Sequence, residues 1–226
     1  MDLRDFFRKY EDLQQVVDRA FDRVKQIYPE NVTCAVKCSE CCHALFDIGI
    51  LEAIYISDRF HGRLDPEKKT KIIARAVQAD RKIYRLKRKA FQNCRSAKDA
   101  RKVLAETARQ RVRCPLLNEQ EQCDLYDFRP VTCRAYGLPV AIQGLAHTCG
   151  KSGFVRGESY PTLNLDKMNR QLNQLAQELV RTMNTRYSGL AEMLVPVSRA
   201  LLTEYDDKFL GVRKEPGCPG KERPGP

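Results

Sequence analysis

Apolar side chains recur every three or four residues through the first part of the chain. They are Leu3, Phe6, Phe7, Tyr10, Leu13, Val16, Val17, Ala20, Phe21, Val24 and Ile27. This spacing predicts an amphipathic helix with one buried stripe, so we expect its aromatic side chains in the core. Asp2 can cap the helix, and Pro29 and Asn31 end it.

Two more helices are expected in the first half of the chain. The apolar positions after Asp47 predict a helix through Phe60, capped by Asp47 and stopped near Gly62. The run Asp65-Pro66-Glu67 then combines a capping residue, a proline in the first turn and an acidic residue near the positive end of the helix dipole. We expect the helix that begins there to extend to about Phe91.

The rest of the chain predicts three further helices, over 97–110, from 164 or 166 to 183, and over 196–210. Ser96 can cap the first of them, and Gly211 can stop the last. No strand-like alternation, internal repeat or glycine-rich phosphate loop is present in the sequence. The pattern therefore indicates a mainly α protein.

Cysteines interrupt this helical pattern in two places. The segment CAVKCSECC carries four of them within nine residues, and a loop-rich segment with several prolines carries four more. The eight are Cys34, Cys38, Cys41, Cys42, Cys114, Cys123, Cys133 and Cys149. No secondary structure requires cysteine at this density, whereas a metal centre does. We therefore expect a helical protein with cysteine-rich metal-binding loops packed between its helices.

The compartment decides whether such cysteines are ligands or disulfides. The chain starts MDLRDFF, without a basic segment followed by an apolar one, so no secretory signal is expected. The most apolar stretch, 45–56, contains two acidic residues and is too short to span a bilayer. We expect a cytoplasmic protein without a membrane partner, in which clustered cysteines bind metal.

The length of 226 residues allows one substantial domain. We expect a single helical metal-binding domain over 1–213, with its cysteine-cluster core at 34–150. Residues 214–226 lack apolar periodicity and should form a disordered tail. Cys94 and Cys218 lie outside both clusters and are expected to have no metal role.

The net charge is +11, and one segment carries all of the excess. Between Lys68 and Arg113 the balance is +14, so the remaining chain is slightly acidic. Nucleic acid or an acidic protein partner would be attracted to this segment, with Tyr84 and Phe91 available for base stacking. A solvated helix face explains the same charges equally well.

Thiolates favour zinc or an iron–sulfur cluster. The spacings Cys34-x3-Cys38 and Cys38-x2-Cys41 fit zinc-binding pairs, and three close cysteines with a distant fourth fit a cluster loop comparably well. We expect that Cys41 and Cys42, being adjacent, cannot easily share one ion. Eight candidates also exceed one four-ligand centre, which indicates either two centres or one centre beside spare thiols.

The second cysteine segment resembles a known family. The run CPLLNEQEQCDLYDFRPVTCRAYG, with the first cluster, resembles the CxxCxxCC cysteine-cluster proteins (YkgJ-like), a zinc- or iron-chelating family that includes flagellin lysine N-methylases. The resemblance covers about half of the chain, from Cys34 to about Cys149, and leaves the terminal helices unassigned. One departure is the spacer Ala35-Val36-Lys37, where the family has two residues.

By this resemblance six of the cysteines correspond to family cysteines: Cys38, Cys41, Cys42, Cys114, Cys123 and Cys133. Arg129, Pro130, Arg134 and Tyr136 match its remaining motif positions. Physically, Arg129 and Arg134 could offset the charge of a multi-thiolate centre or hydrogen-bond to its sulfurs. Pairing with surface acids such as Asp124 and Asp127 is the equally favoured alternative.

The sequence thus supports a Cys-ligated metal protein, with a 4Fe-4S cluster slightly favoured over Zn²⁺. Its centre would serve redox, group-transfer or modification chemistry, although no nucleotide-binding signature supports a methyl-donor site. The alternative is a nucleic-acid-binding module with a structural zinc site, using the basic segment 68–113. A zinc scaffold that binds a protein partner through its helices is a third possibility.

Overall fold

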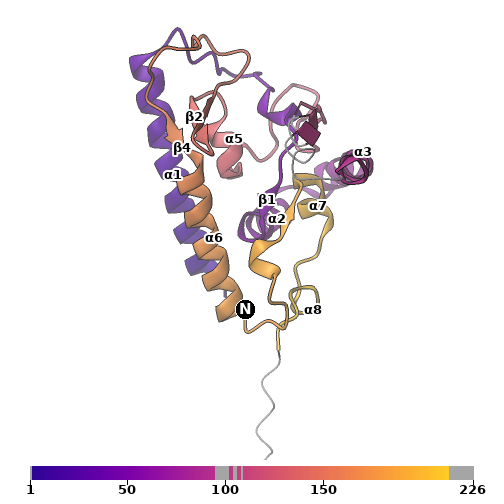
Figure 1. Cartoon of the computed structure of the whole chain (residues 1–226). Helices are drawn as coiled ribbons and strands as arrows, with labels where there is room; N and C mark the ends of the chain where they lie inside the picture. The colour runs from indigo at the N-terminus through magenta and orange to yellow at the C-terminus, as the bar shows by residue number, and fades with distance from the viewer. Residues whose placement is uncertain (1, 95–101, 104–105, 108, 214–226) are drawn as a thin grey trace, which may run out of the picture.

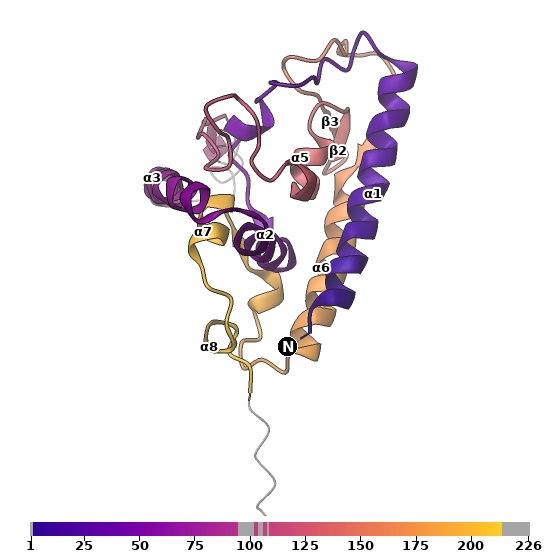
Figure 2. The same ribbon diagram turned by 180° about the vertical axis from the view of Figure 1, so that it is seen from behind.

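The protein is mainly helical in a computed structural model that describes residues 2–94, 102–103, 106–107 and 109–213 (Figure 1). Two long helices run side by side along one flank. Shorter helices and a third long helix form the opposite flank. Between the two flanks, at one end of the molecule, lie the loops that carry the cysteines (Figure 2).

Helices α1 (Arg4–Ile27) and α6 (Leu165–Thr182) form the long pair and run antiparallel. The predicted stripe of α1 is buried at Phe6, Phe7, Tyr10, Val17 and Val24. Gln14 is buried with them, and Val16 and Ile27 are exposed. Asn164, one of the two predicted starts, caps α6, because its side chain accepts a hydrogen bond from the Lys167 N–H at 2.9 Å.

Helices α2 (Ile50–Arg63) and α3 (Pro66–Asn93) begin the opposite flank. Asp65 caps α3, since its carboxylate accepts from the Lys68 N–H at 2.8 Å, which confirms the predicted start. The start predicted for α2 is wrong. Gly49 occupies the capping position there, and Asp47 instead forms an ion pair with Lys87 at 2.6 Å.

The predicted ends of two helices can be compared with the structure. α2 ends at Arg63, one residue past Gly62 and close to its predicted end. The helix predicted over 196–210 is divided into α7 (Val197–Leu202) and α8 (Asp207–Leu210). Asp206 causes the second start, as its side chain accepts from the Phe209 N–H at 2.6 Å. Gly211 ends α8 in the left-handed conformation, as predicted.

Short strands occur where the sequence shows no alternation. β1 (Ile48–Gly49) pairs antiparallel with β5 (Leu194–Val195), with Ile48 opposite Val195. β2 (Val140–Ile142) pairs antiparallel with β3 (Leu145–His147) and parallel with β4 (Leu163–Asn164). These strands are two or three residues long, too short for a period of two to be visible in the sequence.

Two apolar clusters hold the flanks together. One contains buried residues of α1, α2, α6 and the short helix α5 (Val131–Ala135). The other joins α2, α3 and α7 to the loop around Leu116 and Leu125. Because α2 contributes to both clusters, it fixes the position of the cysteine loops relative to the two flanks.

Two predictions concern residues that the structure does not describe. The helix predicted over 97–110 falls largely on such positions, and the tail at 214–226, with Cys218, lies outside the described residues. Among the helices of the described ranges, none combines the length and the apolar character that a membrane span requires.

Candidate metal centre

The backbone brings the two cysteine segments into direct contact. The Cys114 N–H donates to the Cys42 carbonyl at 2.7 Å, and the Val112 N–H donates to the His43 carbonyl at 3.1 Å. An antiparallel bridge joins Ala44 to Arg111. Cys42 lies in a single 3-10 turn, Cys41–His43, so its position is fixed by local backbone geometry as well as by this pairing.

A tight turn brings Cys123 back towards Cys114. Leu117 and Cys123 form an antiparallel bridge at its base. The side-chain oxygen of Asn118 accepts hydrogen bonds from two backbone N–H groups of the turn, each at 3.0 Å. Asparagine commonly stabilises turns in this way. The nine-residue step from Cys114 to Cys123 in the sequence therefore becomes a short distance in space.

Helix α5 supplies another cysteine of the site, Cys133. Pro130 occupies its capping position and fixes the backbone where the chain turns into the helix. The buried Gln14 side chain of α1 donates to the carbonyl of Arg129 at 2.9 Å, just before this turn. α5 also packs against α1, so Cys133 is held towards the cysteine loops by contacts far from it in sequence.

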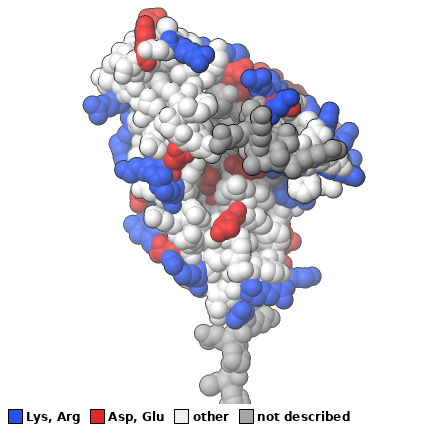
Figure 3. Space-filling model, in the orientation of Figure 1, with Lys and Arg blue, Asp and Glu red and all other residues white. Residues whose placement is uncertain are grey.

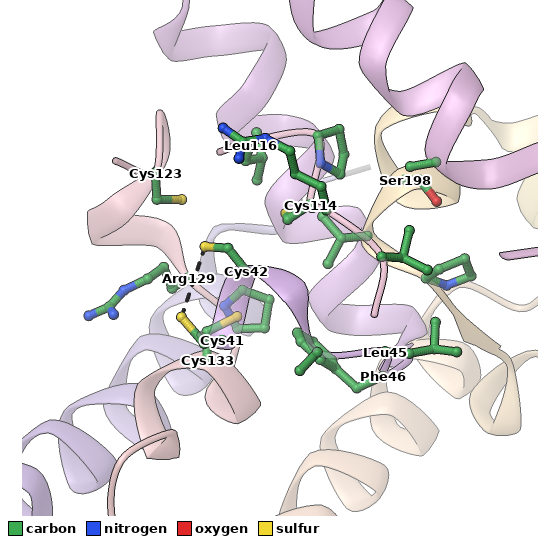
Figure 4. Close-up of a pocket in the computed structure, with 18 of the residues that line it drawn as sticks. Cys41, Cys42, Leu45, Phe46, Cys114, Leu116, Cys123, Arg129, Cys133 and Ser198 are labelled. Carbon is green, nitrogen blue, oxygen red and sulfur yellow. Dashed lines mark hydrogen bonds between the residues drawn. The ribbon is translucent and has the colours of Figure 1, made fainter. Parts of the chain in front are cut away.

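These elements form a cavity of about 50 Å³ whose wall contains thiols on one side. The cysteines that line it are Cys41, Cys42, Cys114, Cys123 and Cys133. In Figure 4 the thiols of Cys41, Cys42, Cys123 and Cys133 turn towards a shared space beside Arg129. The rest of the wall is largely apolar, with Leu45, Ile83 and Val197 among its members. The cavity has room for a small group enclosed by sulfur and hydrocarbon.

The thiols of this cavity differ in acidity. The adjacent Cys42 thiol, assisted by the positive charge of Arg129, lowers the pKa of Cys41 to about 7. The hydrogen bond between the two thiols is the main cause that raises the pKa of Cys42, and burial is the second. Burial raises the pKa of Cys114 to about 12 and that of Cys123 to about 11, and it raises the pKa of Cys133 well above its ordinary value. A cation in the cavity would be needed to hold several of these groups as thiolates.

Arg129 lies at the cavity, whereas Arg134 is directed elsewhere. The Arg129 guanidinium lies 3.6 Å from the centre of the Tyr126 ring, and its Nε donates to the Tyr126 carbonyl at 2.9 Å. Its place in the cavity wall is compatible with the predicted influence on the sulfurs. Neither of the surface acids Asp124 and Asp127 forms an ion pair with it in the described part of the chain.

The three hydrogen bonds of Arg134 all go to oxygen. Its Nη1 donates to the Asp18 carboxylate at 2.6 Å, its Nε donates to the Arg129 carbonyl at 2.9 Å, and its Nη2 donates to the Asp127 carbonyl. The side chain is largely buried. These contacts tie α5 and the preceding turn to α1, and the predicted contact of Arg134 with the sulfurs stays a prediction.

The remaining three candidate cysteines lie outside the cavity wall but near one another. Burial raises the pKa of Cys34 to about 11, with smaller contributions from the neighbouring Cys38, Cys149 and Cys41 thiols. The Cys34 thiol lies 3.7 Å from the Tyr136 carbonyl. The eight candidate cysteines are all free thiols in the structure. Cys41 is thus the residue through which the two groups of thiols approach each other.

Glu40 joins three loops at this point. Its carboxylate forms ion pairs of 2.9 Å with both Arg111 and Lys151, so it ties the first cysteine loop to the segments before Cys114 and after Cys149. Glu40 was not expected from the sequence, because nothing local distinguishes it from other surface acids. Two histidines lie close to candidate cysteines in the sequence. His43 Nδ1 lies 2.9 Å from the Ser39 carbonyl, and His147 is exposed on β3.

Within the described ranges, no three His, Cys, Asp or Glu side chains are positioned to hold one metal ion together as they stand. The sulfurs of Cys41 and Cys42 lie 3.9 Å apart. Two thiolates on one tetrahedral zinc ion lie roughly 3.8 Å apart, given Zn–S bonds of about 2.3 Å. The separation of this pair is therefore close to that of two ligands of one ion, and the expectation that the pair cannot easily share an ion stays a prediction. The other thiols would have to rotate inward to complete a centre.

No protein family, curated protein or solved structure matches this chain.

Proposed function

We propose that this protein binds a Cys-ligated metal centre in the cavity lined by Cys41, Cys42, Cys114, Cys123 and Cys133. The observation that carries the proposal is that five thiols from two distant segments line one small cavity. Ordinary buried cysteines have no reason to gather in this way, because a thiol is a weak hydrogen-bonding group that gains little from another thiol. A soft metal ion gains a bond from each thiolate.

The donor set fits an iron–sulfur cluster first and zinc second. Sulfur is the preferred ligand of both, and five thiols leave one to spare beyond a four-ligand centre. An apolar wall suits a cluster because solvent exposure is one of the factors that set its potential. The cationic Arg129 beside Cys41 would offset part of the negative charge of several thiolates.

When bound, an iron–sulfur cluster would supply electron-transfer or group-transfer chemistry, and zinc would supply structural stability. The chain's own residues would hold the centre and limit its contact with water. The trio Cys34, Cys38 and Cys149 would provide further ligands or a second centre next to the first. The proposed centre serves redox, group-transfer or modification chemistry.

Metal analysis tests the proposal directly. Protein purified without oxygen is assayed for iron, zinc and acid-labile sulfide, and its visible spectrum is recorded. Iron with sulfide and a brown colour is the expected result. Stoichiometric zinc without colour would overturn the cluster and retain the metal site. Protein that takes up neither metal after reduction and reconstitution would overturn the proposal as a whole.

Single substitutions then locate the ligands. Cys42→Ser and Cys133→Ser should each lower metal content, because each removes a thiol from the cavity wall. Cys94→Ser is the matched control, since Cys94 is an exposed residue at the end of α3 outside that wall. Unchanged metal content in both cavity variants, or an equal loss in the control, would contradict this location. A thermal unfolding curve for each variant separates loss of metal from loss of fold.

A further inference from the structure

Helix α3 presents a second feature that the proposed centre does not use. Its buried positions, Ile72, Ala76, Ala79 and Ile83, follow one stripe that faces the apolar cluster and the thiol cavity. With 3.6 residues per turn, the positions 81, 85 and 88 fall roughly opposite this stripe, and the positions 84 and 91 lie beside them on one flank of the helix. They carry three arginines and two aromatic residues: Arg81, Tyr84, Arg85, Arg88 and Phe91. We call these five residues the outer face of α3.

The aromatic residues of the outer face are held in solvent. Tyr84 is 63% exposed and Phe91 is 83% exposed. Beyond Ile83, no side chain of α3 is fully buried up to its end at Asn93. Single exposed apolar side chains are common on protein surfaces, so exposure alone does not mark a site. The informative feature is that these two rings lie two helical turns apart with arginines between and beside them.

The positive charges of the outer face differ from several others on α3. At the start of the helix, Lys71 pairs with Glu67 at 2.7 Å, and Lys68 lies 3.7 Å from Asp65. Farther along, Lys87 pairs with Asp47. Among the residues that the structure describes, no carboxylate forms an ion pair with Arg81, Arg85 or Arg88. Within those described ranges, the charge of the outer face is therefore not neutralised by an ion pair.

We propose that the outer face of α3 binds single-stranded nucleic acid, with the arginines on phosphates and Tyr84 and Phe91 stacked on bases. Arginine and exposed aromatic side chains interleaved along one face match the two requirements of such binding, charge along the backbone and flat rings for the bases. From Arg81 to Phe91 the face extends about 15 Å along the helix. Lys and Arg side chains also gather at the edge of the molecule over α3 in Figure 3.

Single strands are favoured over duplexes for a physical reason. Bases in a duplex are already stacked on each other, so exposed Tyr84 and Phe91 rings could not reach their faces without unstacking them. Carboxylates of an acidic protein segment would satisfy the arginines but would not themselves stack on the two aromatic rings. A nucleic acid bound here would lie about one helix diameter, roughly 10 Å, from the thiol cavity that α3 lines with Ala79 and Ile83.

Fluorescence anisotropy with a labelled short oligo(dT) and oligo(U) tests the proposal. The full chain should bind at low salt, and log K should fall with log salt at a slope of about −2, given roughly −0.7 for each of three phosphate contacts. A duplex of the same length should bind more weakly than the single strands. Absence of binding at about 50 mM salt, or preference for the duplex, would overturn the proposal.

Paired variants separate the two components of binding. Arg81→Ala with Arg88→Ala should reduce the slope by roughly 1.4, since two phosphate contacts are lost. Tyr84→Ala with Phe91→Ala should weaken binding about thirtyfold or more, since two stacking contacts are lost, while leaving the slope unchanged. An aromatic variant that binds like the wild type would overturn the stacking contacts.

Lys68→Ala with Lys71→Ala is the matched control, because it removes the same charge from the same helix at ion-paired positions. It should bind within about twofold of the wild type. A loss as large as that of the arginine variant would show that only net charge attracts the strand and would overturn the outer face as a site. Metal content is measured on the same samples, so that a change in nucleic-acid binding can be distinguished from loss of the proposed metal centre.

Discussion

Glu52 of α2 joins three helices through one buried carboxylate. Its Oε1 accepts hydrogen bonds from the Tyr10 hydroxyl of α1 at 2.9 Å and from the Val131 N–H at the start of α5 at 3.0 Å. Its Oε2 lies 3.4 Å from the Gly49 nitrogen at the start of α2. Glu52 is only 5% exposed and Tyr10 only 1%. The carboxylate therefore fixes α5, which carries Cys133, relative to α1 and α2.

Glu52→Ala should destabilise the protein strongly. The substitution leaves the Tyr10 hydroxyl and the Val131 N–H buried without their acceptor, and each such group costs about 1–3 kcal/mol. The expected loss in the free energy of unfolding is therefore roughly 2–6 kcal/mol. Glu52→Gln retains an oxygen for both donors and should lie within about 1 kcal/mol of the wild type.

Urea unfolding followed by circular dichroism measures both variants. Glu67→Ala is the matched control, since Glu67 is an exposed acid in the first turn of α3 and should change stability by less than about 0.5 kcal/mol. If Glu52→Ala is as stable as this control, the carboxylate does not hold the helices together and the reasoning is refuted. Metal content is recorded alongside, because displacement of α5 would also displace Cys133.

The same carboxylate predicts a pH dependence. Burial raises the pKa of Glu52 above its ordinary value of 4.5. The folded state thus binds this proton more tightly than the unfolded state does. The resulting stability is complete below pH 4.5 and is lost as the pH rises through the raised pKa. Glu52→Gln should remove this component. The unfolding free energy of the variant should therefore rise relative to that of the wild type as the pH increases above 4.5. Parallel pH profiles would contradict the raised pKa.

Five further substitutions test the turn at Gly137, the contacts of Arg134 and the helices α2 and α6. In thermal unfolding, Gly137→Ala should destabilise the protein by about 1–3 kcal/mol, because φ is +100° there and a Cβ would lie 2.3 Å from the Cys34 sulfur. Gly62→Ala is the control in the same assay. It should stabilise the protein by about 0.5–1 kcal/mol, because Gly62 lies in a helix with open space around it. Arg134→Lys should lower the free energy of unfolding in urea by about 1–3 kcal/mol, since one ammonium group cannot reach all three oxygens. Stability equal to the wild type would show that these hydrogen bonds contribute little. Asn164→Ala should cost about 1 kcal/mol through loss of the α6 cap, whereas Asn164→Asp, which retains the acceptor, should not.

Local chemistry was sufficient to predict the main helices. The three-and-four spacing of apolar residues predicted α1, and the cap at Asp65 and the cap at Asn164 predicted the starts of α3 and α6. Each of these signals acts within one or two turns of chain, so it is present in the sequence itself. The prediction failed at Asp47, where a long-range ion pair with Lys87 took the carboxylate away from the helix start.

The candidate site divides in the same way. Cysteine spacing by itself determined which residues are candidate ligands, because a metal requires several thiols and little else in a protein does. Only the tertiary structure decided that five of them share one cavity and that Cys34, Cys38 and Cys149 lie beside it. That division depends on the backbone contact between Cys42 and Cys114, on the packing of α5 against α1 and on the buried carboxylate of Glu52. These contacts join segments far apart in the chain, and residue spacing along a sequence carries no information about them.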